Sequence, residues 1–271
     1  MIKMKPILKY PGAKWRIAEF IVQYIPPHNF YLEPWFGSGA VFFNKYPSKH
    51  ETINDIDGLV VNFFEVCRDH PEELIEKIQL TPFARDEFLS VEEDHAGGAI
   101  HLTGDKVEDA RRFAVRCWMG FGSKLSDRVG FKVNRQSNGP QNPKIWDSLP
   151  ETIVQASKRI KNATIENGDA VDLIHKHNQE DCFIYADPPY LLETRRSRIY
   201  RCESGDRNRH IELLEALKAH KGTVILSGYE NELYDEYLQG WSKAKINTTA
   251  TCSKQRTETI WMNFEPNLFH F

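Results

Sequence analysis

The sequence predicts an α/β fold, in which a mostly parallel β-sheet is interrupted by a helical insert. Three observations predict it. Short apolar strands alternate with helical segments between residues 30 and 68, the alternation stops from about 70 to 160, and it returns after residue 163. Alternation of this kind is typical of a parallel sheet, whose ligands bind at the carboxyl ends of the strands.

The elements before residue 70 are predicted by their apolar pattern and by the residues that end them. Both strands are short and close on polar residues, Glu33-Pro34 in one and Asn54-Asp55 in the other. The segments between them carry an apolar face, as helices on a sheet do. The expected elements are a helix at 15–24, a strand at 30–32, a helix at 40–46, a strand at 51–53 and a helix at 58–68.

Beyond residue 70 the pattern changes twice. Four helical segments without a strand between them predict the insert, at 71–79, 82–93, 107–119 and 151–160. Strands and helices then alternate again, and the last two strands are spaced as an antiparallel pair. The expected elements are strands at 163–165, 182–186 and 223–226, a helix at 209–219, and the antiparallel strands 244–250 and 258–263.

The composition is that of an ordinary globular protein. Of the 271 residues, 41% are hydrophobic and 27% are charged, which argues against disordered and fibrous classes. No apolar run approaches the ~20 residues of a membrane helix, and no apolar signal core follows the basic N-terminus. The five cysteines are scattered and form no Cys-x-x-Cys pair. We therefore expect a cytoplasmic protein with no zinc ribbon, no metal and no membrane.

The net charge of −3 conceals an uneven distribution. Residues 51–100 hold 13 acids and three bases, whereas residues 111–144 hold eight bases and one acid, and 193–209 hold six arginines and three acids. Most such clusters are solvated surface, but 120–144 is also rich in Gly, Ser, Asn and Pro, with two interleaved Phe side chains. A basic loop with aromatic residues suits contacts to phosphates and bases. The candidate DNA-binding residues are Arg116, Lys124, Arg128, Lys132, Arg135, Arg195 and Arg196.

A glycine motif follows the first strand and opens a helix. In Glu-Pro-Trp-Phe-Gly-Ser-Gly, at 33–39, the two glycines allow close approach of a ligand to the backbone. A dinucleotide fingerprint needs a third small residue where Phe42 stands, and the chain has no P-loop motif. The motif therefore favours a nucleotide-like ligand without a pyrophosphate. Asp55, after the second strand, could accept hydrogen bonds from ribose hydroxyls, or it could merely cap the next helix, as Asp57 also could.

The sharpest motif is Asp-Pro-Pro-Tyr at 187–190, after the apolar strand at 182–186. Two prolines make the segment rigid and end the strand. Asp187 and the carbonyl of Pro188 are hydrogen-bond acceptors beside an aromatic ring, which suits a planar amino group on a heterocycle. A plain exit turn is the alternative for this motif alone. The turn Tyr-Pro-Gly-Ala-Lys at 10–14 indicates only a helix start.

Taken together, these motifs resemble the Dam-like (D12) class of DNA adenine N6-methyltransferases. The order of the motifs at 10–14, 33–39, 54–55 and 187–190 matches, and 254–264 is similar to that family's last strand. The resemblance covers most of 5–70 and 163–265. Ala13 stands where the family usually has Gly, and Trp35 where it usually has Phe.

The resemblance implies a Rossmann-like methyltransferase sheet, formed by 1–69 and 161–271, with a target-recognition insert at 70–160. It implies S-adenosylmethionine as cofactor, double-stranded DNA as partner and transfer of a methyl group to N6 of a flipped-out adenine. Asp187, Pro188, Pro189 and Tyr190 would be the catalytic segment. The implied cofactor-binding residues are Tyr10, Lys14, Trp35, Gly37, Gly39, Asp55 and, in the adenine contact, Asp169.

Two other functions remain open from the sequence. An RNA or protein methyltransferase would share the aromatic-after-proline motif, but such enzymes usually begin it with Asn, whereas residue 187 is Asp. A DNA-binding protein that lost catalysis would not need Asp187, Tyr190, Gly37 and Gly39 intact. The resemblance implies a bacterial or phage-infected cell and the nucleoid as location. The flanking bases of the target, a restriction partner and the oligomeric state are not implied.

Overall fold

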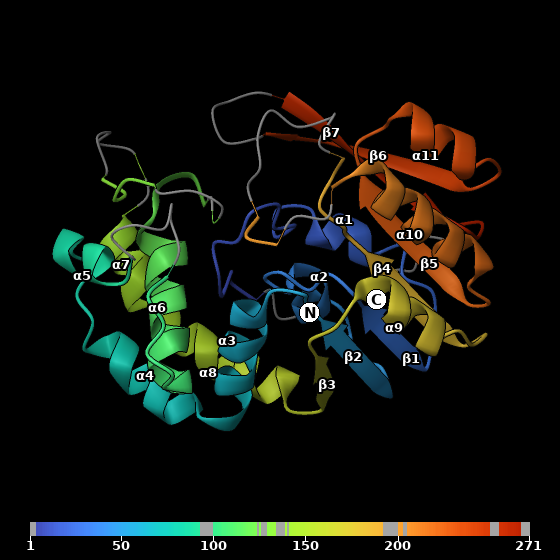
Figure 1. The fold of residues 1–271 in the computed structure, drawn as a ribbon. Helices are drawn as coiled ribbons and strands as arrows, with labels where there is room; N and C mark the ends of the chain where they lie inside the picture. Colours follow the sequence, from blue (N-terminus) through green and yellow to red (C-terminus); the bar gives the residue numbers. More distant parts are fainter. Residues whose placement is uncertain are drawn as a thin grey trace.

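A computed structural model of the chain describes residues 4–92, 100–123, 125, 129–133, 139, 141–191, 200–202, 205–249 and 255–266. Within them, a seven-stranded sheet carries helices on both faces, and a lobe of further helices lies beside it (Figure 1). The expected α/β fold is confirmed. Among the described residues, no helix has the length and apolar character needed to cross a bilayer.

The strands run in the order β3-β2-β1-β4-β5-β7-β6. Their bounds are β1 (Phe30–Glu33), β2 (His50–Asn54), β3 (Ala163–Glu166), β4 (Cys182–Ala186), β5 (Thr223–Gly228), β6 (Ser242–Thr249) and β7 (Gln255–Met262). Strands β1 to β5 pair in parallel, and β7 runs antiparallel to β6, as expected. It also runs antiparallel to β5, which was not predicted. The strand order reverses between β1 and β4, and in doubly wound sheets ligands bind outside the carboxyl ends at such a point.

Helices cover the two faces of the sheet unequally. The described helices are α1 (Ala18–Val22), α2 (Ala40–Asn44), α3 (Gly58–Asp69), α4 (Pro71–Gln79), α5 (Arg85–Ser90), α6 (Lys106–Met119), α7 (Asn142–Asp147), α8 (Leu149–Ile160), α9 (Ala170–Lys176), α10 (Arg207–Ala219) and α11 (Glu232–Tyr237). Successive strand residues enter opposite faces. Phe183 and Ile225 join the core with α1, α2, α3 and the α4–α8 lobe, whereas Ile184 and Leu226 join α9, α10 and α11.

The α4–α8 lobe lies to the left of the sheet in Figure 1 and is continuous with its core. Helices α6 and α8 pack against α3. The rings of Phe63 in α3 and Phe113 in α6 are 6.2 Å apart in an edge contact. Arg159 of α8 also donates a hydrogen bond of 2.8 Å to Glu51 of β2. An apolar core and an ion pair therefore fix this lobe against the sheet.

Most differences from the expected elements concern short helices, and β7 begins at Gln255 rather than at residue 258. Helices α7, α9 and α11 were not predicted, because six or seven residues span too few turns to establish a helical period. Helix α1 occupies only Ala18–Val22 of the expected 15–24, and α5 only Arg85–Ser90 of 82–93. In the basic segment, a short 3-10 turn at Phe121–Ser123 lies between the two residues of an isolated bridge, Gly120 and Phe131.

Candidate active site

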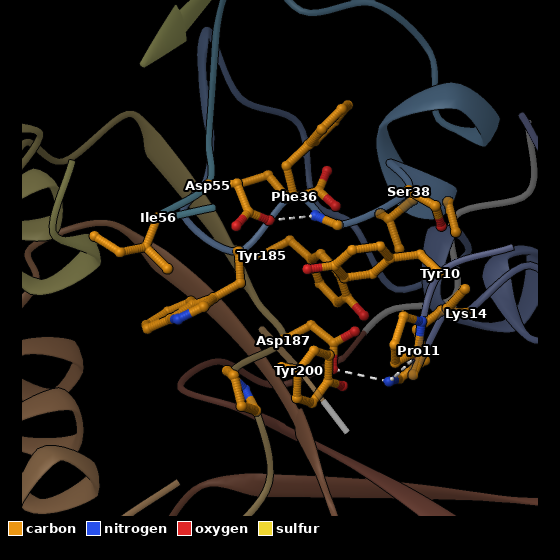
Figure 2. A pocket seen from close by; sticks show the side chains of 18 of the residues that line it. Tyr10, Pro11, Lys14, Phe36, Ser38, Asp55, Ile56, Tyr185, Asp187 and Tyr200 are labelled. Carbon is orange, nitrogen blue, oxygen red and sulfur yellow. Dashed lines mark hydrogen bonds and ion pairs between the residues drawn. The ribbon is translucent and has the colours of Figure 1, made fainter. Parts of the chain in front are cut away.

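A pocket opens where β1, β2 and β4 end, and Figure 2 shows its side chains converging from these strands and the N-terminal segment. Its empty volume, counted together with the open solvent at its mouth, is about 540 Å³. Most of the predicted cofactor residues and two of the catalytic ones line it. These residues are Tyr10, Lys14, Trp35, Gly37, Asp55, Asp187 and Pro189.

The turn after β1 needs both of its glycines. Gly37 has φ +50° and Gly39 has φ +68°, a left-handed region that other residues rarely adopt. A Cβ atom on Gly37 would lie 3.0 Å from the ring of Tyr10, and one on Gly39 would overlap the ring of Phe36. The backbone at Gly37 therefore lies directly against Tyr10. Gly39 is the residue before α2 and does not line the pocket.

Asp55 ties the glycine turn to the end of β2. Its two carboxylate oxygens accept hydrogen bonds from the backbone N–H groups of Gly37 at 2.8 Å and Asp57 at 2.9 Å. Burial raises the pKa of Asp55 to about 7, although these two hydrogen bonds lower it. Each oxygen keeps a further lone pair with which a ligand hydroxyl could bond. Figure 2 shows the Gly37–Asp55 hydrogen bond on one side of the pocket and the Lys14–Asp187 ion pair on another.

Asp57, rather than Asp55, caps the helix that follows. Its side chain accepts a hydrogen bond of 3.0 Å from the N–H of Leu59 at the start of α3. Arg201 forms an ion pair of 2.6 Å with the same buried carboxylate. The alternative in which Asp55 is only a helix cap is therefore wrong, while its contact with a cofactor stays a prediction.

Lys14 connects the N-terminal segment to the end of β4. Its Nζ lies 2.8 Å from Oδ1 of Asp187 and donates a 2.9 Å hydrogen bond to the carbonyl of Gly12. Burial alone would lower the pKa of Lys14, but the carboxylates of Asp187 and Glu258 raise it above its usual value. Burial raises the pKa of Asp187 to about 6, and Lys14 opposes that rise. At neutral pH both groups are therefore ionised.

Tyr190 is held from three sides. Its hydroxyl donates a 2.6 Å hydrogen bond to Oε2 of Glu258. Its ring makes an edge contact with the ring of Tyr229, with centroids 4.5 Å apart and planes at 68°. The ammonium group of Lys14 lies 4.8 Å from the centroid of Tyr190, within range of a cation–π interaction. The orientation of this ring is therefore defined by side chains from β7, from the end of β5 and from the N-terminal segment.

His210 of α10 supports the same segment from the other face of the sheet. Its Nε2 lies 3.0 Å from the carbonyl oxygen of Pro189, and its Nδ1 lies 2.9 Å from the hydroxyl of Tyr234. A carbonyl oxygen only accepts hydrogen bonds, so Nε2 carries a proton and donates a hydrogen bond to the carbonyl oxygen of Pro189. The buried imidazole therefore fixes the 187–190 segment against α10.

Asp169 lies apart from the first pocket. It caps α9, accepting a 2.9 Å hydrogen bond from the N–H of Val171, and it forms a 2.5 Å ion pair with Arg209. It lines a neighbouring pocket, whose empty volume with the solvent at its mouth is about 740 Å³ and which shares Trp35, Ile56 and Cys202 with the first. A ligand that contacts both pockets would extend past these three side chains.

The structure contradicts one of the expected DNA contacts. Arg116 lies on α6 with 1% of its surface exposed, and its Nε is 3.4 Å from Oε1 of Glu92. The prediction that Arg116 binds a phosphate is wrong, because a count of charges does not tell which face of a helix carries them. Lys132 is half-buried beside Lys9. Burial, followed by the nearby Lys132, lowers the pKa of Lys9 to about 7. The remaining five candidates lie outside the described residues, namely Lys124, Arg128, Arg135, Arg195 and Arg196.

Two residues that the sequence did not single out take part in the site. Glu258 belongs to the segment similar to the family's last strand, but nothing in its spacing indicates that it meets Tyr190. His210 lies on the buried face of an amphipathic helix, where a histidine is usually interpreted as a residue of the hydrophobic core. In the described part of the chain, no group of three or more His, Cys, Asp or Glu side chains could hold a metal ion.

A family model described as "D12 class N6 adenine-specific DNA methyltransferase" matches residues 10–254. The match therefore covers both pockets and the helical lobe.

Individual relatives agree with that match. The chain is 30% identical over 267 residues to the Type II methyltransferase M1.LlaDCHI of Lactococcus lactis subsp. cremoris, covering 92% of this chain and 90% of the relative. It is 26% identical over 273 residues to the Type II methyltransferase M.MjaIII of Methanocaldococcus jannaschii, covering 90% and 91%. It is 22% identical over 196 residues to a DNA adenine methylase of Vibrio cholerae serotype O1, covering 70% and 66%.

Proposed function

The chain belongs to the D12 class of N6 adenine-specific DNA methyltransferases, and we propose that S-adenosylmethionine binds in its first pocket while residues 187–190 act on the adenine. Methyl transfer to N6 of adenine in DNA is the reaction of this class, and the relatives are named accordingly. The observation that carries the proposal is the ion pair of Lys14 and Asp187, which faces the glycine turn across one pocket.

The side chains of the first pocket suit this methyl donor. When bound, S-adenosylmethionine supplies a methyl group on a positively charged sulfur. The rings of Tyr10 and Trp35 suit a cation, and the carboxylate of Asp55 suits a sugar. Asp55 would accept hydrogen bonds from the ribose hydroxyls with its remaining lone pairs. The neighbouring pocket beyond Trp35 would receive the adenine of the cofactor, with Asp169 near its end.

Asp187, the Pro188 carbonyl and Tyr190 would prepare the target base. The N6 lone pair is delocalised into the adenine ring, so the amino group is a poor nucleophile. Hydrogen bonds from its two N–H groups to Asp187 and to the Pro188 carbonyl favour a pyramidal nitrogen and direct the lone pair to the methyl carbon. S-adenosylmethionine would supply the methyl group and keep the C–S electron pair on its sulfur, and Asp187, with a pKa of about 6, would accept the proton that N6 loses.

Tyr190 would stack on the extruded adenine. Extrusion from the duplex costs a few kcal/mol, and stacking in the site recovers part of it. Orientation and electrostatic alignment then supply most of the acceleration, since no covalent enzyme intermediate is required.

The helical lobe is proposed as the target-recognition domain, residues 70–160, inserted into the catalytic domain formed by 1–69 and 161–271. The position of the basic segment 111–144 supports this proposal. The Gly120–Phe131 bridge brings Lys132 beside Lys9, next to the N-terminal segment that lines the pocket. Phe121, at the end of α6, is 64% exposed. Double-stranded DNA that contacts these side chains would lie close to the pocket.

The test is methylation by the purified protein. Unmethylated double-stranded DNA is incubated with labelled S-adenosylmethionine, and the nucleosides are separated by mass spectrometry. We expect N6-methyldeoxyadenosine as the only new base. Absence of that product on genomic DNA of several base compositions would contradict the assignment, and label in RNA or protein instead would support the alternative substrates.

The catalytic role of Asp187 is tested with a variant. Asp187→Ala should lose methyl transfer by at least about 100-fold while it still binds S-adenosylmethionine, since the group contacts the base. The matched control is Asp86→Ala, which removes an exposed carboxylate from α5. Near-normal turnover of Asp187→Ala would show that the acceptor is another group.

A further inference from the structure

Glu258 reaches the site from a strand that runs opposite to the others. In β7, Thr259 pairs with Gly228, the last residue of β5. Glu258 comes just before Thr259 in the chain, and because the two strands are antiparallel it lies beyond the end of β5. Tyr229 directly follows β5 at the same level. An antiparallel strand thus places a carboxylate at the carboxyl edge of a parallel sheet, and Glu258 as a residue is only 9% exposed.

The carboxylate of Glu258 accepts the hydrogen bond from Tyr190 at 2.6 Å, which is short for a bond between two oxygen atoms. The two prolines at 188 and 189 fix the backbone before Tyr190, but they do not fix its side-chain torsions. The bond to Glu258 anchors the far end of the ring, and Tyr229 supports its edge. A phenylalanine at 190 would keep the ring and lose this anchor.

We propose that Glu258 is a positioning residue for methyl transfer, which holds the Tyr190 ring by its hydroxyl in the orientation that stacks on the extruded adenine. The inference rests on the proposed role of Tyr190. Glu258 does not touch the reacting atoms; it acts through the hydroxyl. Replacement of Glu258 would let the Tyr190 ring rotate. The ring would then stack less well on the adenine, and methyl transfer would be slower.

Glu258 also interacts electrostatically with Lys14, so its charge and its hydrogen bond must be separated. Glu258→Gln keeps an acceptor for Tyr190 and removes the charge, whereas Glu258→Ala removes both. Tyr190→Phe removes the donor and leaves the carboxylate. Glu236→Gln is the matched control, since it removes an exposed charge on α11.

The measurements are the single-turnover rate of methyl transfer and the Kd for S-adenosylmethionine, on DNA that the wild-type protein methylates. Misplacement of a reacting group by ~1 Å costs up to about 100-fold, so we expect Glu258→Ala and Tyr190→Phe each to slow transfer by about 10- to 100-fold. Cofactor Kd should stay within about twofold, and Glu258→Gln should recover most of the rate. Because both changes break one bond, the double variant Tyr190→Phe/Glu258→Ala should be no slower than the slower single variant.

Three results would overturn the inference. They are a normal rate for Tyr190→Phe, a Glu258→Gln rate as low as that of Glu258→Ala, and a double variant whose losses multiply. The second would assign Glu258 a role through its charge on Lys14. Retained cofactor binding shows that a slow variant is folded. Failure of the wild-type protein to methylate any DNA would instead contradict the proposed function. The activity of the wild-type protein is therefore measured before that of any variant.

Discussion

The ammonium group of Lys14 lies 2.8 Å from the carboxylate of Asp187, although 172 residues separate them in the chain. Burial raises the pKa of this carboxylate to about 6, and the lysine opposes that rise. Asp187 is therefore kept ionised, and able to accept hydrogen bonds with both oxygens, when the N-terminal segment places Lys14 beside it. It explains why a turn of low specificity at 10–14 belongs to the same site as the Asp-Pro-Pro-Tyr motif.

The rate of transfer should rise with pH through the pKa of Asp187, about 6, and level off above it. Only the ionised carboxylate accepts hydrogen bonds with both oxygens, so the protonated form at lower pH is inactive. Lys14→Met removes the opposing cation, raises the pKa of Asp187 further and should move the acidic limb up by about one pH unit. The pH dependence of the single-turnover rate measures this. Lys161→Met, an exposed control, should leave the limb in place, and an unmoved limb in Lys14→Met would refute the coupling.

Gly37→Ala should impair cofactor binding more than folding. Both Gly37 (φ +50°) and Gly240 (φ +84°) are left-handed, so alanine costs about 1–2 kcal/mol of stability at either position. Only at Gly37 does the new methyl group press on Tyr10, at 3.0 Å, whereas at Gly240 it meets nothing within 4 Å. We expect calorimetry to show at least about tenfold weaker binding of S-adenosylmethionine to Gly37→Ala, equal to ~1.4 kcal/mol, and unchanged binding to Gly240→Ala. Equal affinities would mean that the turn does not contact the cofactor.

Sequence reasoning reached the parts of the site that follow parallel strands. Asp55 and Asp187 stand directly after apolar strands, and the ends of parallel strands meet at one edge, so their convergence could be predicted. Glu258 could not, because β7 is antiparallel and its register against β5 is set by pairing between distant segments. The pairing of Asp55 with the N–H of Gly37 also depends on the conformation of the turn, which residue types alone do not give.

The same limit explains Arg116 and the short helices. A basic segment can be recognised from composition, but the side of α6 on which each arginine lies follows from how α6 packs on α3. Helix α9 begins at the Asp169 cap and ends seven residues later, too soon for a period to show. Asp169, which was predicted from family resemblance to contact the cofactor, is engaged as that cap and with Arg209.

Binding of DNA should take up a proton at Lys9. Burial, followed by Lys132, lowers the pKa of Lys9 to about 7, so at pH 8 the group is mostly neutral in the free protein. A phosphate placed beside both lysines would raise that pKa and charge Lys9. Titration calorimetry at pH 8 in buffers of different ionisation enthalpy should therefore show uptake of up to one proton, and at pH 6 almost none. Lys9→Gln should abolish the uptake; uptake that persists in this variant would place the titrating group elsewhere.

Replacement of Arg116 should act on the fold and not on DNA contacts. The guanidinium is 1% exposed and faces Glu92, so Arg116→Leu leaves a buried carboxylate without this partner and should lower the free energy of unfolding by about 3–5 kcal/mol. Arg68→Leu, which breaks an exposed pair with Asp69, should cost less than about 1 kcal/mol. Denaturant titration measures the loss of stability in both variants.

For the folded protein, the slope of log K for DNA against log salt should be unchanged in Arg116→Leu, whereas Lys132→Gln should reduce it by about one. A reduced slope in Arg116→Leu would show that this arginine leaves the core to meet a phosphate when DNA binds.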